Sequence, residues 1–267
     1  MSTERFKRQS FLGANSQDQI ARTVIGVVGL GGGGSHIVQQ LAHIGFQNFV
    51  LYDDDVVEDS NLNRLIGGTA VDERSMSQKL YVARRMIFGL QPQANVVGVP
   101  SKWQQDPSAL QRCNIVFGCM ETLLARSELE VFTRRYLIHY IDIGMDVHGD
   151  NPPVIGGQVV LSSPDGPCMR CVRFLTDEGL TDEAARYGDA GDRPQVVWPN
   201  GVLASTAVGI AIDLVTGWTR KRRNFDYLVY DGTRGTVKPS LYIQKREFGP
   251  CPHFPTDAIG DPRFTEL

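Results

Sequence analysis

The chain lacks the features that would place it in a specialised class. It has only 5 cysteines in 267 residues, an odd number that does not suggest the disulfide framework of a secreted domain. Its net charge of −3 gives no general reason to expect a nucleic acid or an anionic membrane as partner. No N-terminal stretch has the parts of a signal peptide. We therefore expect a cytoplasmic protein.

Long apolar runs are missing too. The most apolar late stretch, 202–218, is interrupted by Ser205, Thr206 and Asp213, so we expect it to be too polar to span a membrane. The apolar content of 42% and charged content of 21% are those of an ordinary globular protein. The length allows one large α/β domain or two small ones.

Short apolar segments alternate with amphipathic segments over residues 24–142. Strands are expected at 24–29, 48–53, 94–99, 114–118 and 137–142, and helices near 35–45, 76–89, 107–112 and 122–135. This alternation predicts an α/β fold that is Rossmann-like, with a mostly parallel sheet and helices on both faces.

The character of the chain changes after residue 150. The patterns predict antiparallel strands at 154–162 and within 227–244, a buried helix at 201–219, and a mobile loop or short helix at 177–192. We therefore expect a single domain over 1–267, with a nucleotide-binding core at 1–150 and an antiparallel extension at 151–267.

A run of glycines follows the first predicted strand and opens the first long helix. In this run, Gly29 permits a tight turn, Gly31 lets the backbone approach a phosphate, and Gly34 allows close helix–strand packing. The helix N-terminus offers free N–H groups and a positive dipole end to an anion. Asp53, which follows Gly34 by 19 residues, is spaced to bind a ribose. The first βαβ unit is predicted to bind a nucleotide.

The carboxyl ends of parallel strands open on one crevice. We therefore expect residues 29–34, 53–55, 118–122 and 142–146 to surround a common site.

Glycines alone do not separate phosphoryl chemistry from hydride transfer, but the residues after the second strand do. A second carboxylate, Asp55, follows Asp53, and then come Asn61, Arg64 and Lys79. Cations of this kind neutralise charge that grows or moves on a triphosphate, whereas nicotinamide chemistry has no use for them.

At these residues the chain resembles the adenylating domain of the ThiF/MoeB and ubiquitin-activating superfamily. The resemblance runs over nearly the whole chain and is carried by residues 53–64, DDDVVEDSNLNR, and residues 5–9, RFKRQ. It implies binding of ATP and Mg²⁺ and adenylation of the C-terminal glycine carboxylate of a small ubiquitin-like or sulfur-carrier protein, with release of pyrophosphate.

The resemblance also implies roles for individual residues. Asp53, beside Asp55, would hold the ribose, and Asn61, Arg64 and Lys79 would hold the phosphates. Arg8 matches the arginine that reaches the triphosphate of the partner subunit in a homodimer, and the apolar helix at 201–219 is a candidate to pack across the twofold axis.

One position departs from the family pattern. The magnesium-binding aspartate that follows the fourth strand is replaced by Glu121, and the next asparagine by Thr122. Glutamate keeps the charge but adds a methylene, so the metal geometry must adjust. We expect Glu121 to be the metal ligand, with an ion pair to Arg126 as the alternative.

The other candidate site is made of cysteines. Cys168 and Cys171 have the spacing that lets two thiolates bind one tetrahedral ion. The resemblance implies a second pair near the C-terminus, where only Cys251 and His253 are available. We expect a Cys₃His structural zinc site that staples the C-terminal segment to the body, with a site that has lost its metal or a redox-active CxxC as alternatives.

Ubiquitin-activating relatives also use a cysteine for a thioester step, but residues 176–207, which correspond to that region, contain none. Either the chain stops at the acyl-adenylate, and a second protein such as a sulfurtransferase or a conjugating enzyme continues, or the thiol comes from elsewhere.

We therefore interpret the chain as a cytoplasmic, homodimeric, ATP-dependent adenylating enzyme. Three other hypotheses remain. The chain could adenylate a different carboxylate, on a peptide C-terminus or a modified tRNA base, although the near-neutral charge counts against nucleic acid. It could be a catalytically silent scaffold subunit, or a nicotinamide-dependent oxidoreductase.

Overall fold

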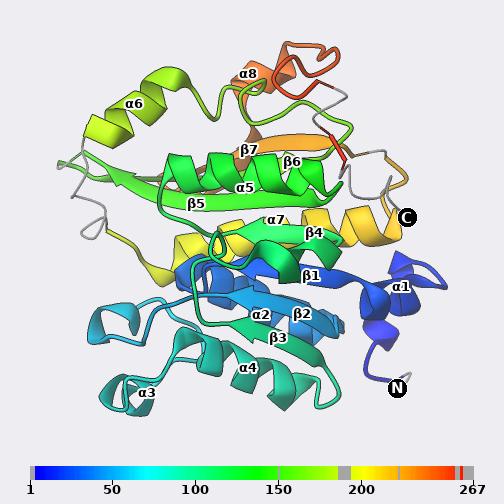
Figure 1. The fold of residues 1–267 in the computed structure, drawn as a ribbon, viewed down its shortest axis with the longest axis vertical. Coiled ribbons are helices and arrows are strands. Elements are labelled where there is room, and N and C mark those ends of the chain that lie inside the picture. Colours follow the sequence, from blue (N-terminus) through cyan, green and yellow to red (C-terminus); the bar gives the residue numbers. More distant parts are fainter. Residues whose placement is uncertain (1–3, 150, 186–193, 222, 256–258, 261–267) are drawn as a thin grey trace.

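The computed structural model describes residues 4–149, 151–185, 194–221, 223–255 and 259–260. These residues form one eight-stranded sheet in the order β3-β2-β1-β4-β5-β6-β7-β8 (Figure 1). The strands from β3 to β5 in this order run parallel, and β6, β7 and β8 continue the same sheet in antiparallel pairing. The predicted α/β fold with an antiparallel extension is confirmed.

The parallel half alternates strands and helices. Its strands are β1 (Val24–Val28), β2 (Asn48–Tyr52), β3 (Asn95–Val99), β4 (Ile115–Gly118) and β5 (His139–His148). Its helices are α1 (Ser16–Arg22), α2 (Gly32–Ile44), α3 (Ala70–Arg74), α4 (Lys79–Leu90) and α5 (Leu123–Arg135), with 3₁₀ turns η1 (Lys7–Leu12), η2 (Asp59–Asn61) and η3 (Pro107–Arg112). The central strands β1, β2 and β4 are almost wholly buried, as a sheet covered on both faces requires.

The extension consists of β6 (Val154–Ser162), α6 (Asp177–Ala185), α7 (Val197–Thr216), β7 (Phe225–Asp231), β8 (Thr236–Pro239) and α8 (Leu241–Gln244). The prediction of strand up to residue 244 was wrong over its last residues. Strand β8 ends at Pro239, and the Ser240 hydroxyl then caps a helical turn by accepting a hydrogen bond from the Tyr242 N–H.

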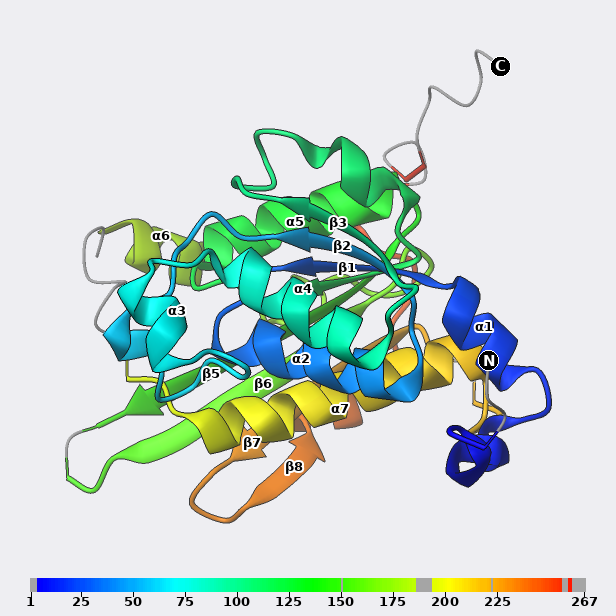
Figure 2. The ribbon, with the colours of Figure 1, turned by 90° about the horizontal axis from the view of Figure 1, so that it is seen from below.

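Two apolar layers sandwich the sheet. Helices α2, α4 and α7 lie on one face and α5 lies on the other (Figure 2). On the first face, Leu41 of α2 and Leu203 of α7 join Phe117 of the sheet in one buried cluster. On the second face, Leu129 of α5 and Met169 belong to a separate cluster.

Helix α7 begins four residues earlier than the predicted 201–219. Its first turn tolerates Pro199, because the N–H groups there have no partner within the helix. By length and composition alone, α7 is apolar enough to cross a membrane, so the expectation that this stretch is too polar was wrong. Half of its most apolar window is buried inside the fold, where α7 packs on α2, β5 and β6.

Strand β5 runs six residues past the predicted end at residue 142, because it pairs with β6 from Tyr140 to His148. Asp142 is therefore a fully buried residue within a strand and does not line an open crevice. The next residue, Ile143, does reach the glycine turn as expected, since its Cδ1 lies 2.7 Å from the position of a Cβ on Gly33. The glycine run, residues 53–55 and residues 119–122 do follow the carboxyl ends of β1, β2 and β4.

Candidate nucleotide-binding and metal-binding sites

The glycine turn is packed too tightly for side chains at two of its positions. Gly29 has a φ of 88°, and a Cβ atom there would lie 2.6 Å from the Cys119 carbonyl oxygen. A Cβ at Gly34 would lie 1.9 Å from the Gly29 carbonyl oxygen. The turn therefore brings the end of β1 directly against α2 and against the loop after β4.

The third predicted glycine faces open space. Gly31 is the N-cap residue of α2, and a Cβ added to it would meet nothing within 4 Å. No side chain caps α2 in the described chain, so the N–H groups of its first turn are open to an anion. The geometry fits a phosphate over Gly31.

Asp53 joins the glycine turn to the end of β2. Its Oδ2 accepts a hydrogen bond of 2.6 Å from the Leu30 N–H, and its Oδ1 accepts one of 3.0 Å from the Asp55 N–H. The residue is 9% exposed. Burial raises the pKa of the Asp53 carboxyl, and the nearby charge of Lys79 opposes that rise.

Lys79 points back toward the end of β2 although it begins α4. Its Nζ lies 2.6 Å from Asp55 Oδ2, and its own N–H donates to the Asp55 carbonyl oxygen at 3.0 Å. The Lys79 side chain is 11% exposed, whereas that of Asp55 is 63% exposed. The ammonium group is thus held beside Asp53 at the edge of the nucleotide site.

Arg64 lies against the glycine turn. Its Cδ is 3.4 Å from the position of a Cβ on Gly32, and its Nη1 donates to the Ser60 carbonyl oxygen and to Asn63 Oδ1. Among the described residues no carboxylate pairs with Arg64. Its charge is therefore free to meet a phosphate.

Asn61 is mostly used within its own loop. Its Oδ1 accepts from the Glu58 N–H, and its Nδ2 donates to the Ser60 hydroxyl. The side chain therefore stabilises the turn that carries Arg64. This role is additional to the phosphate contact predicted from the sequence.

A profile of the ThiF family matches residues 5–251, which is most of the chain. The chain belongs to the ThiF family. Its relatives include the SAMP-activating enzyme E1 of Haloferax volcanii, which is 29% identical over 98% of this chain and 94% of that protein. The ThiS adenylyltransferase of Escherichia coli is 27% identical over 63% of this chain and 66% of that protein.

A longer relative and a solved structure also match the chain. The adenylyltransferase and sulfurtransferase UBA4 of Saccharomyces cerevisiae is 28% identical over 63% of this chain, which spans only 38% of that longer protein. Among solved structures, E. coli MccB with ATP superimposes with a TM-score of 0.72 at 17% identity, covering 94% of this chain and 73% of MccB. At this identity the match shows a shared fold.

Glu121, the position that departs from the ThiF pattern, is exposed in the loop between β4 and α5. The alternative pairing of Glu121 with Arg126 is wrong, because Arg126 pairs with the buried Asp142 and donates to the Met120 carbonyl oxygen. Arg126 thereby holds the loop that presents Glu121. Burial raises the pKa of the Asp142 carboxyl to about 6, and Arg126 opposes the rise.

The segment of η1, which contains Arg8, lies at the end of α2 that is opposite to the glycine turn (Figure 2). The adjacent Gln9 donates to the Ile44 carbonyl oxygen at the end of α2. Since α2 has 13 residues, roughly 20 Å separates its two ends. Arg8 is exposed, and a single subunit does not bring it to the other predicted phosphate ligands.

The four predicted zinc ligands come together. Their ligand atoms, from Cys168, Cys171, Cys251 and His253, all lie within 4.8 Å of one another. The Cys168 and Cys171 sulfurs are 3.7 Å apart, and each is 3.4 Å from His253 Nδ1. Such spacings fit four ligands around one tetrahedral ion with metal–sulfur bonds of about 2.3 Å.

The two remaining cysteines are packed inside the fold. Burial raises the pKa of the Cys113 thiol to about 12 and also raises that of Cys119. Neither is a ready thiolate, and we interpret both as packing residues.

Sequence reasoning missed two polar residues at the site. Asn200, in the first turn of α7, lies 2.6 Å from the position of a Cβ on Gly32 and is 5% exposed. Glu183 of α6 accepts hydrogen bonds from the Leu123 and Leu124 N–H groups at the start of α5. Both come from the extension, and no motif in the sequence links that region to the glycine turn.

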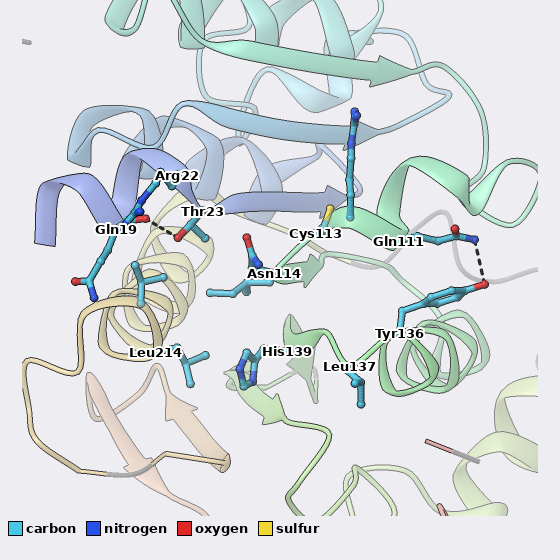
Figure 3. Close-up of a pocket in the computed structure, with 13 residues that line it drawn as sticks. Gln19, Arg22, Thr23, Gln111, Cys113, Asn114, Tyr136, Leu137, His139 and Leu214 are labelled. Carbon is cyan, nitrogen blue, oxygen red and sulfur yellow. Dashed lines mark hydrogen bonds between the residues drawn. The ribbon is translucent and has the colours of Figure 1, made fainter. Parts of the chain in front are cut away.

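A cavity of about 650 Å³ lies at the amino ends of the parallel strands, where β1, β4 and β5 begin. Gln19, Asn114, Leu137 and His139 surround it (Figure 3). None of the predicted site residues lines this cavity, so it is separate from the nucleotide site.

The glycine turn yields a paired prediction. We expect Gly31→Ala to keep the melting temperature of the parent, because its Cβ meets no atom, but to weaken ATP binding at least tenfold, because the methyl group lies where a phosphate must approach. Gly34→Ala should instead lower the melting temperature by several degrees, because its Cβ collides with backbone. Calorimetry of unfolding and of ATP binding checks both. Unchanged ATP affinity in Gly31→Ala would contradict this placement of the phosphates.

Proposed function

We propose that the chain is an ATP-dependent adenylyltransferase that activates the C-terminal glycine carboxylate of a small ubiquitin-like or sulfur-carrier protein and releases pyrophosphate. The observation that carries the proposal is that Arg64 packs against the uncapped first turn of α2, while Lys79 lies near Asp53, whose carboxylate binds the Leu30 N–H of the glycine turn. Membership of the ThiF family and the names of the relatives from H. volcanii and E. coli support the substrate class.

Each residue of the site has a separate role in binding ATP. Asp53 holds the ribose, the first turn of α2 binds a phosphate, and Arg64 and Lys79 neutralise the leaving pyrophosphate. The attacking carboxylate is already ionised at neutral pH, so the reaction needs no general base. Positioning for in-line attack at the α-phosphorus then supplies most of the rate.

Magnesium fits the exposed carboxylate of Glu121. Mg²⁺ is commonly bound by one or two carboxylates together with substrate phosphates, and it keeps several waters. A single glutamate in the loop after β4 is enough for such a site. When bound, the ion would polarise the phosphates and stabilise the pyrophosphate.

The product is an acyl-adenylate that a second protein consumes. The chain offers no cysteine in residues 176–207, and Cys113 and Cys119 are packed residues with raised thiol pKa values. A sulfurtransferase or a conjugating enzyme therefore supplies the next nucleophile.

The Cys₃His cluster holds a structural zinc ion. Four protein ligands fill a tetrahedral shell and leave no open position for a substrate. The cluster joins residues 168–171 to the C-terminal segment, some 80 residues further along the chain.

The active form is a cytoplasmic homodimer in which Arg8 reaches the triphosphate of the partner. Turn η1, which contains Arg8, lies at the end of α2 away from the glycine turn of its own subunit, and α7 exposes apolar surface at Val202 that a second copy would cover.

ATP–pyrophosphate exchange tests the proposed activity. We expect exchange to depend on a small protein that ends in glycine, and to fall about 100-fold or more in Lys79→Ala, because a cation that stabilises the leaving group is lost. Arg135→Ala, an exposed arginine near the end of α5, is the control and should retain full exchange. A free peptide as sole acceptor, or nucleotide binding without any exchange, would favour the peptide-modifying or the scaffold hypothesis.

The zinc site is tested by metal content and by stability. We expect one zinc ion per chain by elemental analysis. His253→Ala should lower the melting temperature by roughly 10 °C, or about 3 kcal/mol. His148→Ala, which alters an exposed histidine, should change neither quantity. A zinc-free protein whose melting temperature is unaffected by a chelator would contradict the site.

Subunit mixing tests whether Arg8 acts across the dimer. Arg8→Ala and Lys79→Ala should each be nearly inactive. When the two are mixed and exchange subunits, half of the dimers contain one complete site, so about a quarter of the parent activity should return. If Arg8 acted within its own subunit, no mixed dimer would contain a complete site and activity would stay at the level of the single variants.

A further inference from the structure

One side chain connects Arg64 to the segment that leads into α7. Asn63 Oδ1 accepts a hydrogen bond of 3.0 Å from Arg64 Nη1, and Asn63 Nδ2 donates one of 3.1 Å to the Gln195 carbonyl oxygen. Arg64 is a proposed phosphate ligand, whereas Gln195 follows Asn63 by 132 residues. A single amide thus joins the nucleotide site to a distant part of the fold.

The chemistry of the partners fixes how this amide is oriented. A guanidinium only donates hydrogen bonds and a carbonyl only accepts them, so the Asn63 oxygen must face Arg64 and its nitrogen must face Gln195. A carboxylate in its place would bind Arg64 more strongly but would repel the Gln195 carbonyl oxygen. An alanine would reach neither group.

The same segment also comes close to Arg64 at the glycine turn. Asn200 and the Arg64 Cδ both lie within 3.4 Å of the position of a Cβ on Gly32, so the start of α7 and the stem of Arg64 pack against one turn of α2. The Asn200 side chain also donates to the Val196 carbonyl oxygen, which holds it in place. Segment 194–200 is therefore linked to the surroundings of Arg64 at two points, through Asn63 and at Gly32.

Asn63 orients Arg64 without neutralising it. Both acceptors of Nη1, the Ser60 carbonyl oxygen and Asn63 Oδ1, are uncharged. The full positive charge thus remains available for a phosphate, while two of the donor directions of the guanidinium are already fixed.

We propose that Asn63 is a positioning residue. It couples the binding of a phosphate by Arg64 to the position of segment 194–200. The proposal rests on the proposed function for the role of Arg64, but the coupling itself needs only ATP binding. When ATP engages Arg64, the Asn63 amide is held between its two partners, and segment 194–200 is fixed against the site.

Kinetics of the exchange reaction test the positioning role. Asn63→Ala should raise KM for ATP about 5- to 10-fold with kcat within about twofold, because loss of a charge-assisted hydrogen bond weakens ground-state and transition-state binding alike. Asn63→Asp should raise KM further, because its carboxylate neutralises Arg64. Asn63→Gln keeps both hydrogen-bonding groups and should recover part of the affinity. Asn95→Ala, an exposed asparagine at the start of β3, is the matched control and should behave as the parent.

Fluorescence tests the coupling without any turnover. Trp198 is 57% exposed within the segment, so acrylamide quenching reports on its surroundings. A non-hydrolysable ATP analogue at saturation should reduce quenching in the parent and in Asn95→Ala, but not in Asn63→Ala. Trp198→Phe should abolish the change and so assign it to this residue rather than to the chain's two other tryptophans.

The two assays separate the possible failures. An unchanged KM for ATP in Asn63→Ala, or the same loss of quenching in Asn63→Ala as in the parent, would overturn the coupling. If the parent shows no exchange with any acceptor, the proposed function fails, while the fluorescence result still decides whether Asn63 links ATP to the segment.

Discussion

The nucleotide site depends on the hydrogen bonds that the buried carboxylate of Asp53 accepts from the Leu30 and Asp55 N–H groups. They tie the ends of β1 and β2 together and fix the entry of the chain into α2, whose N-terminus has no side-chain cap in the described chain. The Gly29 and Leu30 N–H groups are bound by the Tyr52 carbonyl oxygen and by Asp53. In the described chain, the N–H groups of the first turn of α2 have no side-chain cap, which is the arrangement that an anion requires. The two cations proposed to bind phosphate lie close to this turn: Arg64 packs against Gly32, and Lys79 lies near Asp53.

The antiparallel extension completes the site from the other side. Helix α7 packs on α2 and carries Asn200 to the glycine turn, while Glu183 of α6 binds the start of α5 beside the loop of Glu121. Arg126 of α5, which pairs with Asp142 of β5, binds that same loop at the Met120 carbonyl oxygen. The extension and the parallel core thus form a single sheet whose two halves share one site, which explains why the ThiF profile spans both.

The sequence predicted features that depend on the spacing of neighbouring residues. It did not predict features that depend on which strands or side chains pair across the fold. The glycine turn, Asp53 and the Cys168–Cys171 pair follow from spacing, whereas Cys251 and His253 were expected from the family resemblance. The length of β5 did not follow from spacing, because β6 extends it, and the partner of Arg126 is a buried strand residue that no motif marks. Asn200 and the Asn63–Gln195 contact join segments more than 130 residues apart, so a single sequence carries no signal for them. The ligand roles of the predicted site residues, Arg8 and Glu121 among them, remain predictions.

A crystal structure with a non-hydrolysable ATP analogue tests the central claim most directly. We expect the ribose at Asp53, the phosphates over Gly31 and the first turn of α2, and the side chains of Arg64 and Lys79 within hydrogen-bonding distance of phosphate oxygens. ATP bound elsewhere, for instance in the cavity at the amino ends of the parallel strands, or bound with both cations turned into solvent, would contradict the account.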